Sequence, residues 1–112
     1  MYQTLFKANG EIVKIKYTPS QKRLYKILNT ETIECCNFGI FYNGKDHHEV
    51  EIVMDDLAIK KEKPINHIIT DAMSKSAFYR NVEYMKCYKI DKIVCCGDIL
   101  VITEEDLILD TA

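Results

Sequence analysis

Four of the five cysteines occur as two adjacent pairs, Cys35-Cys36 and Cys95-Cys96. Thiolates at a suitable spacing bind metal ions, form disulfides or act as nucleophiles. Zinc-binding pairs are usually separated by about two to four residues so that both thiolates reach one ion, whereas these pairs have no intervening residue. Successive side chains of a strand point to opposite faces, so only one cysteine of each pair can face the core. We therefore predict free thiols that act as small apolar residues, with no metal ion bound.

Two other interpretations of these thiols stay open. One cysteine from each pair could join His47 or His48 in a mixed metal site, and a disulfide could link the two pairs. The odd number of cysteines, and an N-terminal segment without an apolar core before a cleavage site, favour free thiols in a reducing intracellular compartment. We expect the two histidines to lie in a polar hairpin loop, because adjacent histidines rarely converge on one ligand.

A cluster of basic and hydroxyl side chains near the N-terminus is the candidate binding site. Residues 1–30 carry six basic side chains and one acidic side chain, a net charge of +5, whereas residues 31–112 carry 9 basic and 16 acidic side chains, a net charge of −7. The cluster joins a strand face to the start of a helix, where free N–H groups and the helix dipole favour anions. Its members are Lys14, Lys16, Thr18, Ser20, Lys22, Arg23 and Lys26. Its candidate ligand is a small anion or a signalling nucleotide; the alternatives are an acidic surface of a partner protein and a basic face that is only solvated.

No motif for common enzyme chemistry is present. The chain contains no GxxxxGK[ST], GxGxxG, HExxH or GxSxG segment, and its 4 glycines are too few for a glycine-rich phosphate cradle. The acidic runs Asp55-Asp56 and Glu104-Glu105-Asp106 contain ligands suited to Mg²⁺, but such runs are commonly solvated strand ends. We predict a binding protein rather than an enzyme, with no catalytic residues and no cofactor.

Composition and charge exclude two classes of partner. The sequence pI of about 5.9 and the small number of basic side chains disfavour duplex nucleic acid. The longest apolar runs hold four or five residues, as in Ile99-Leu100-Val101-Ile102, whereas a membrane helix needs about 20. A chain of 112 residues with 47% hydrophobic and 29% charged residues predicts one globular domain over residues 1–112.

Residue periodicity predicts the element order β-β-α-β-β-α-(α)-β. The expected strands cover residues 2–8, 11–17, 32–38, 50–56 and 99–102, with a two-residue turn at Asn9-Gly10 and a turn over 42–46. The expected helices run from a Thr18 cap to about Leu28 with Asn29 as the stop, from Pro64 to Met73, and over 77–85. We therefore predict an α+β fold. It is a single small domain with a mixed or mostly antiparallel sheet of about five strands, and two or three helices packed mainly on one face.

Short segments along most of residues 11–103 resemble one known family. They are Ile33-Glu34, the MDDLAI segment at 54–59, Pro64-Ile65-Asn66 opening a helix that contains Thr70, and the GDILVI segment at 97–102. The chain resembles a family of small uncharacterised α+β proteins encoded by phages, some bacteria and large DNA viruses. It departs from the family at residues 29–31, which lack a glycine-rich turn, and at residues 74–92, which resemble an insertion. The resemblance implies a viral or phage-like accessory protein with no assigned catalytic residues.

The combined interpretation is a small non-catalytic binding protein in the host cytoplasm. It would act by contact with a host protein or by self-association, for example as a homodimer that covers the edges of its sheet. Seven tyrosines and no tryptophan supply material for an exposed, tyrosine-bearing apolar patch. The alternative function is the binding and sequestering of an anion or signalling nucleotide by the basic cluster.

Overall fold

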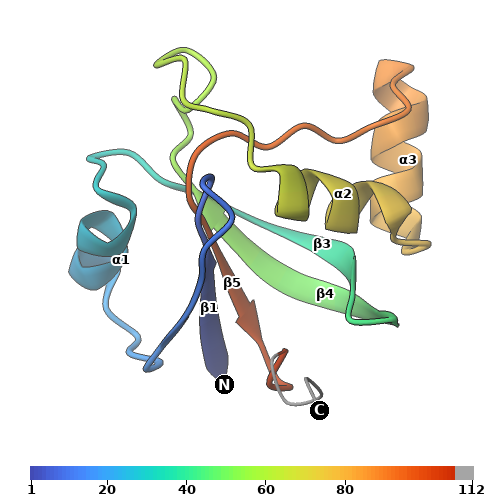
Figure 1. Cartoon of the computed structure of the whole chain (residues 1–112). Helices are drawn as coiled ribbons and strands as arrows, with labels where there is room; N and C mark the ends of the chain where they lie inside the picture. Colours follow the sequence, from blue (N-terminus) through green and yellow to red (C-terminus); the bar gives the residue numbers. More distant parts are fainter. Residues whose placement is uncertain (108–112) are drawn as a thin grey trace.

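The computed structural model describes residues 1–107, which form a five-stranded sheet with helices on both faces (Figure 1). Each strand is antiparallel to its neighbours, in the order β2-β1-β5-β4-β3. The elements are β1 (Tyr2–Phe6), β2 (Ile12–Ile15), α1 (Gln21–Leu28), β3 (Glu34–Tyr42), β4 (Lys45–Met54), α2 (His67–Lys75), α3 (Tyr79–Tyr88) and β5 (Ile99–Thr103). This architecture confirms the predicted α+β class and the predicted order of elements.

The central strand β5 is buried along its whole length, as its continuous apolar run predicts. Side chains alternate between the two faces of the sheet. Ile99 and Val101 join the core beneath α2, whereas Leu100 and Ile102 join the core beneath α1. The sheet therefore separates two hydrophobic cores, and β5 contributes to both.

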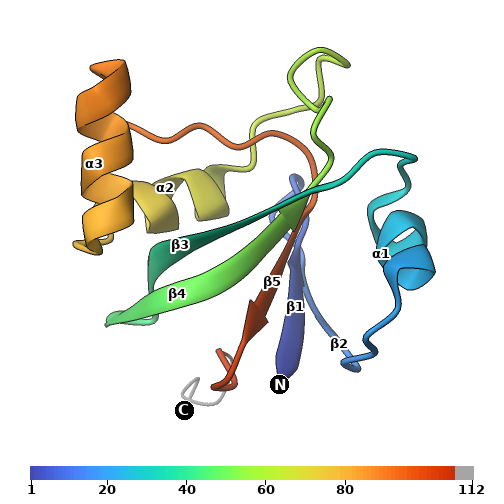
Figure 2. The same cartoon turned by 180° about the vertical axis from the view of Figure 1, so that it is seen from behind.

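Two helices cover one face of the sheet and one helix covers the other (Figure 2). Helix α2 buries Ile69, Ala72 and Met73 against the first core. Helix α1 places Leu28, with the partly buried Leu24, against the second core. Among residues 1–107, no helix combines the length and the apolar character needed to cross a bilayer.

The turn of the first hairpin, between β1 and β2, differs from the prediction. Gly10 has a left-handed φ of +94°, whereas Asn9 is absent from the residues with positive φ. Lys7 N–H donates to the Glu11 carbonyl at 2.8 Å, and the Asn9 side chain accepts from Glu11 N–H at 2.9 Å. The loop therefore has three residues with glycine in the bulge position, and the predicted two-residue turn is wrong.

Strands β3 and β4 are longer than their sequence pattern predicts. Asn43 and Gly44, with φ of 52° and 74°, make the tight turn, so pairing continues up to Tyr42 and Lys45. His47 and His48 consequently lie within β4, and the prediction that they occupy a hairpin loop is wrong. The sequence pattern does not indicate a strand here, because the side chains of this part of β4 are polar and lie on a surface that water reaches.

The helix starts also differ from the prediction, whereas the predicted stop is confirmed. The Thr18 hydroxyl donates to the Lys16 carbonyl instead of capping, and α1 begins at Gln21 after an extended Ser20 that makes no side-chain cap bond. Asn29 ends α1 in the left-handed conformation, with φ of 49°. Helix α2 begins only at His67, because the preceding residues are held in extended conformation by other contacts.

Those contacts converge on Asn66, a fully buried residue. Its amide nitrogen donates to the carbonyls of Phe6 at 2.7 Å and Gly97 at 3.0 Å, and its amide oxygen caps α2 by accepting from Ile69 N–H. One side chain thus joins the end of β1, the start of α2 and the segment that leads into β5.

We predict that Asn66→Asp lowers the free energy of unfolding by about 2–3 kcal/mol or more, because a carboxylate would face two carbonyl oxygens in a buried site. Asn37→Asp, at an exposed position of β3, should change it by about 0.5 kcal/mol or less. Urea unfolding followed by circular dichroism compares the two variants. Equal stabilities would show that the Asn66 amide is not required for the fold.

Candidate functional site

A groove of about 260 Å³ opens on the α2/α3 face of the sheet beside β3, and we call it the β3 groove. Four separate parts of the chain form it, namely β3, the end of β4 with its following loop, helices α2 and α3, and the segment before β5. Its lining residues are Glu34, Cys36, Phe38, Met54, Asp55, Asp56, Ala58, Ile59, Met73, Tyr84, Ile93, Val94, Cys95 and Cys96.

Backbone pairing fixes the wall of the groove that precedes β5. Asn66 N–H donates to the Cys95 carbonyl, and Gly97 N–H donates to the Pro64 carbonyl, both at 2.8 Å. The Thr70 hydroxyl accepts from Cys95 N–H at 3.0 Å. Segments 64–66 and 95–97 therefore run side by side, as the isolated bridge between Ile65 and Cys96 also shows.

Both cysteine pairs contribute to this groove. Strand alternation separates Cys35, which is exposed, from Cys36, which is partly buried and lines the groove with Cys95 and Cys96. The Cys95 sulfur lies 3.5 Å from the sulfur of Met73. All five cysteines are free thiols, and residues 1–107 contain no group of three or more His, Cys, Asp or Glu arranged to hold a metal ion.

Burial keeps two of the groove thiols, those of Cys36 and Cys95, protonated. Burial, with smaller contributions from Glu34 and the neighbouring thiol, raises the pKa of Cys36 to about 11. Burial, with smaller contributions from Cys36 and Cys96, raises the pKa of Cys95 to about 12. A thiolate nucleophile needs the opposite shift, which a nearby cation or helix N-terminus supplies. These thiols therefore act as polarisable apolar surface.

A buried carboxylate holds the loop that forms the other wall. Asp55 accepts from Lys61 and Lys63, each at 2.8 Å, and from Thr32 and Leu57 N–H, each at 3.0 Å. Burial raises the pKa of this carboxyl, but the hydrogen bonds from the two lysines, Leu57 and Thr32 together hold it well below its usual range. Asp55 is thus a structural anchor, with its oxygens already occupied.

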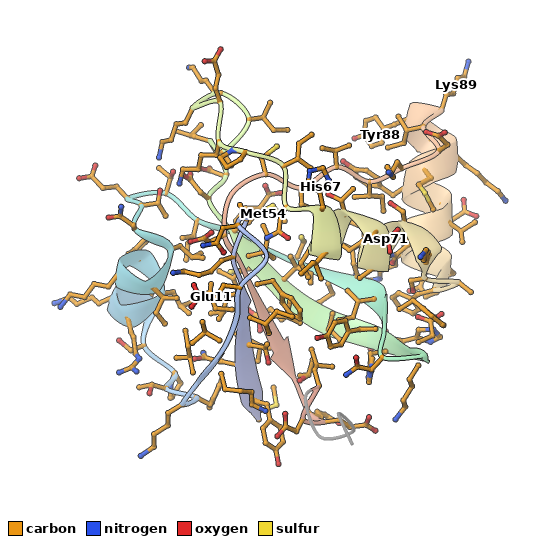
Figure 3. All side chains as sticks on the ribbon, viewed as in Figure 1. Glu11, Met54, His67, Asp71, Tyr88 and Lys89 are labelled. Carbon is orange, nitrogen blue, oxygen red and sulfur yellow. The ribbon has the colours of Figure 1, made fainter. Side chains whose placement is uncertain are left out.

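The rim of the groove exposes large apolar side chains. Ile59 is 72% exposed and Val94 is 48% exposed. Tyr84 contacts Phe38 at 5.5 Å and Tyr88 at 4.7 Å between ring centroids. Helix α3, which carries both tyrosines, buries fully only one of its residues and projects from the sheet, with Lys89 at its end pointing away from the body of the protein (Figure 3). Apolar surface therefore continues from the groove onto α3.

The structure divides the predicted anion cluster. Lys14 forms an ion pair with Asp106, and its ammonium lies over the Tyr2 ring at 4.8 Å from the centroid. Val13 and Ile15 pack beneath α1, so Lys14 lies on the opposite face of the sheet from that helix. The Thr18 and Ser20 hydroxyls therefore do not converge with it on one site.

Three of the other four basic residues of the cluster lie on α1, whereas Lys16 is exposed just after β2. Lys22, Arg23 and Lys26 are exposed, and within residues 1–107 they form no ion pair. None of the cluster residues lines the β3 groove. Anion binding by α1 therefore stays a prediction.

A second hollow, of about 410 Å³, collects polar side chains from β4 and the end of β5. Glu105 contacts Lys45 at 2.5 Å, and its carboxylate oxygen lies 3.7 Å from His47 Nδ1. Asp46 accepts from the Ser76 hydroxyl at 2.7 Å and from Ala77 N–H at 2.8 Å. These groups tie β4 to neighbouring segments and do not pair a nucleophile with a base.

The sequence contained only indirect signals of the β3 groove. Two of the seven tyrosines, Tyr84 and Tyr88, belong to the expected tyrosine-bearing patch. Exposed Ile59 was missed, although an apolar residue within a lysine-rich loop is a signal that could have identified it. The convergence of Cys36 with Cys95 was also missed, because it depends on contacts across 59 residues of sequence.

We predict that iodoacetamide at about pH 8 labels native Cys87 and leaves Cys36 and Cys95 unmodified, because Cys87 is exposed, whereas Cys36 is partly buried, Cys95 is buried, and burial raises the pKa of both thiols. Mass spectrometry of tryptic peptides after timed labelling measures the order in which the cysteines react. Urea-unfolded protein serves as the fully reactive control. Labelling of Cys95 as fast as Cys87 would contradict this assignment.

We predict that Asp55→Asn lowers the free energy of unfolding at neutral pH by about 2 kcal/mol, whereas Asp56→Asn, at an exposed neighbour, changes it little. Lys61 and Lys63 are partly exposed, so the loss should lie below that of a fully buried ion pair. Because the folded pKa of Asp55 is depressed, its contribution is present above about pH 4 and is lost as pH falls further. Urea unfolding at several pH values should therefore show that the free energies of unfolding of the wild type and Asp55→Asn become equal in acid.

Comparisons of this chain with protein-family models, with curated proteins and with solved structures give no match. The groove is thus described by its own geometry, without a relative whose function could be compared.

Proposed function

We propose that this protein is a non-catalytic interaction protein whose β3 groove receives an apolar side chain from a partner protein. The observation that carries the proposal is the exposure of Ile59 and Val94 at the rim of a groove lined by Phe38, Tyr84 and thiols. Exposed aromatic and aliphatic side chains around a pocket are typical of the energetic centre of a protein interface.

The size of the groove favours a side chain over a free metabolite. Ligand pockets for small molecules commonly enclose about 300–1,000 Å³, and the β3 groove holds about 260 Å³. A leucine-sized or phenylalanine-sized group on a longer segment would fill it, while the rest of the segment contacts Tyr88 and the neighbouring surface of α3. The exposed carboxylates of Glu34 and Asp56 at the groove favour a partner with positive charge beside the apolar group.

The arrangement of the groove favours binding over catalysis. Cys36 and Cys95 have raised pKa values, and the buried carboxylate of Asp55 is neutralised by Lys61 and Lys63. Nucleophilic catalysis requires an activated nucleophile next to a base. The Cys36 and Cys95 thiols instead contact the Ile52 carbonyl and the Met73 sulfur. The proposal extends the resemblance noted in the sequence: the partner would be a host protein contacted by a phage or viral accessory factor, or a second copy of this chain.

The experiment uses a random dodecapeptide display library selected against the folded protein. Peptides that bind the wild type should bind Ile59→Asp or Val94→Asp at least about tenfold more weakly, equivalent to about 1.4 kcal/mol, because a carboxylate would be placed where an apolar group docks. Ile90→Asp is the matched control, since Ile90 is exposed and does not line the groove. Fluorescence anisotropy of the selected peptides measures each Kd.

Selection of no peptide that distinguishes Ile59→Asp from Ile90→Asp would refute the proposal. Sedimentation velocity of the unliganded protein covers the case of a second copy as the partner. In that case, the wild type and Ile90→Asp should self-associate as the protein concentration rises, and Ile59→Asp should remain monomeric.

A further inference from the structure

The outer edge of β3 presents unpaired backbone groups beside the groove. β3 is the last strand of the sheet and pairs only with β4. Backbone N–H and C=O groups of successive strand residues point to opposite sides of the strand. Gly39 directs its N–H and C=O outward, so Asn37 and Cys35, two and four residues earlier, direct theirs outward too. Within residues 1–107, no hydrogen bond to the backbone of Asn37 or Cys35 comes from that side.

At Gly39 the edge already binds an amide group. The Asn81 side chain accepts from Gly39 N–H at 2.7 Å and donates to the Gly39 carbonyl at 2.8 Å. This is the pair of bonds that one facing residue of a neighbouring antiparallel strand would make with its N–H and C=O. Gly39 is required there, because a Cβ would lie 2.6 Å from the Phe78 Cβ. The Asn81 amide thus imitates an added strand and closes the edge at this residue.

The two edges of the sheet differ in how they are protected. The opposite edge strand, β2, has four residues and includes Lys14, and short length and lysine both discourage pairing. The open part of β3 contains Glu34, Cys35, Cys36, Asn37 and Phe38, with no lysine or proline. An unprotected edge is a common site for an extended partner segment.

Space and charge beside this edge match such a segment. A hollow of about 700 Å³ lies along Cys35, Cys36, Asn37 and Phe38 and is bordered by Glu51 of β4 and Arg80 of α3. Arg80 lies at the end of the edge near Phe38, and Glu34 lies at the other end. A segment laid along the edge therefore meets the Arg80 cation at one end and the Glu34 carboxylate at the other, with the Glu51 carboxylate opposite Asn37 between them.

We infer that the outer edge of β3 from Glu34 to Phe38 accepts an extended segment of a partner protein as a sixth strand. The inference rests on the proposed function, because alternate side chains of the added strand lie on the face of Cys36 and Phe38 and one of them enters the β3 groove. The segment carries an apolar residue at its centre, an acidic residue near Arg80 and a basic residue near Glu34. Pairing with the added strand ends before Gly39, because Asn81 already binds the backbone N–H and C=O of that residue.

The test uses the displayed dodecapeptides that depend on Ile59, with two variants at one edge position. Asn37→Pro removes the outward N–H without touching the bonds between β3 and β4, and Asn37→Ala is its matched control. Peptide affinity should fall at least about tenfold for Asn37→Pro and change less than about twofold for Asn37→Ala. Circular dichroism and thermal unfolding establish that both variants are folded.

A second measurement needs no variant. Hydrogen exchange of the wild type, followed by NMR, should show the Cys35 and Asn37 amides protected when peptide is bound, and N-methylation of alternate peptide residues should abolish binding. If Ile59-dependent peptides bind while both amides exchange freely and N-methylation has no effect, the added strand is refuted and the groove proposal stands. If the library contains no Ile59-dependent peptide, both proposals fail together.

Discussion

The buried amide of Asn66 is the contact on which the arrangement of this protein depends. It satisfies the carbonyls of Phe6 and Gly97 and the N–H of Ile69 in the first turn of α2, three groups that come from separate parts of the chain. Leaving such groups unpaired in the interior costs about 1–3 kcal/mol each. The same contact fixes where segment 95–97 lies against segment 64–66, and hence where Cys95 and Cys96 stand in the groove. The position of the candidate site is therefore set by a hydrogen-bonding requirement of the core.

Burial sets the chemical character of two of the groove thiols, Cys36 and Cys95. Desolvation disfavours the thiolate, and it is the first cause of the raised pKa of both Cys36 and Cys95. A neutral thiol next to Met73 offers polarisable surface that adapts to the shape of a ligand. The strong ion pairs around Asp55 act in the same direction, because they neutralise the buried carboxylate at the base of the loop. The groove thus combines the neutral thiols of Cys36 and Cys95 and apolar side chains with the exposed carboxylates of Glu34 and Asp56.

The groove and the open edge are adjacent because α3 covers β3 incompletely. Its Asn81 closes the edge at Gly39, and its Tyr84 packs against Phe38, but its remaining surface is largely exposed. Backbone groups along Cys35 and Asn37 give directional hydrogen bonds, whereas the groove beside them gives apolar contact. A partner segment that uses both gains orientation from the first and affinity from the second. Neither surface depends on the basic residues of α1, which lie over the other core (Figure 2).

Local physical preferences in the sequence determined the elements and their order. The apolar run from Ile99 to Ile102 specified a central strand, Asn29 specified a helix stop, and the alternation at Cys35-Cys36 specified one inward and one outward thiol. These features depend on neighbouring residues alone.

Tertiary structure decided the rest. The extension of β4 through His47 and His48 depends on pairing with β3, and the groove brings together residues from Glu34 to Cys96. The division of the basic cluster likewise follows from the side of the sheet on which α1 packs. Contacts between distant segments leave no periodic pattern in the sequence, because each side chain can satisfy its local preference in many different packings.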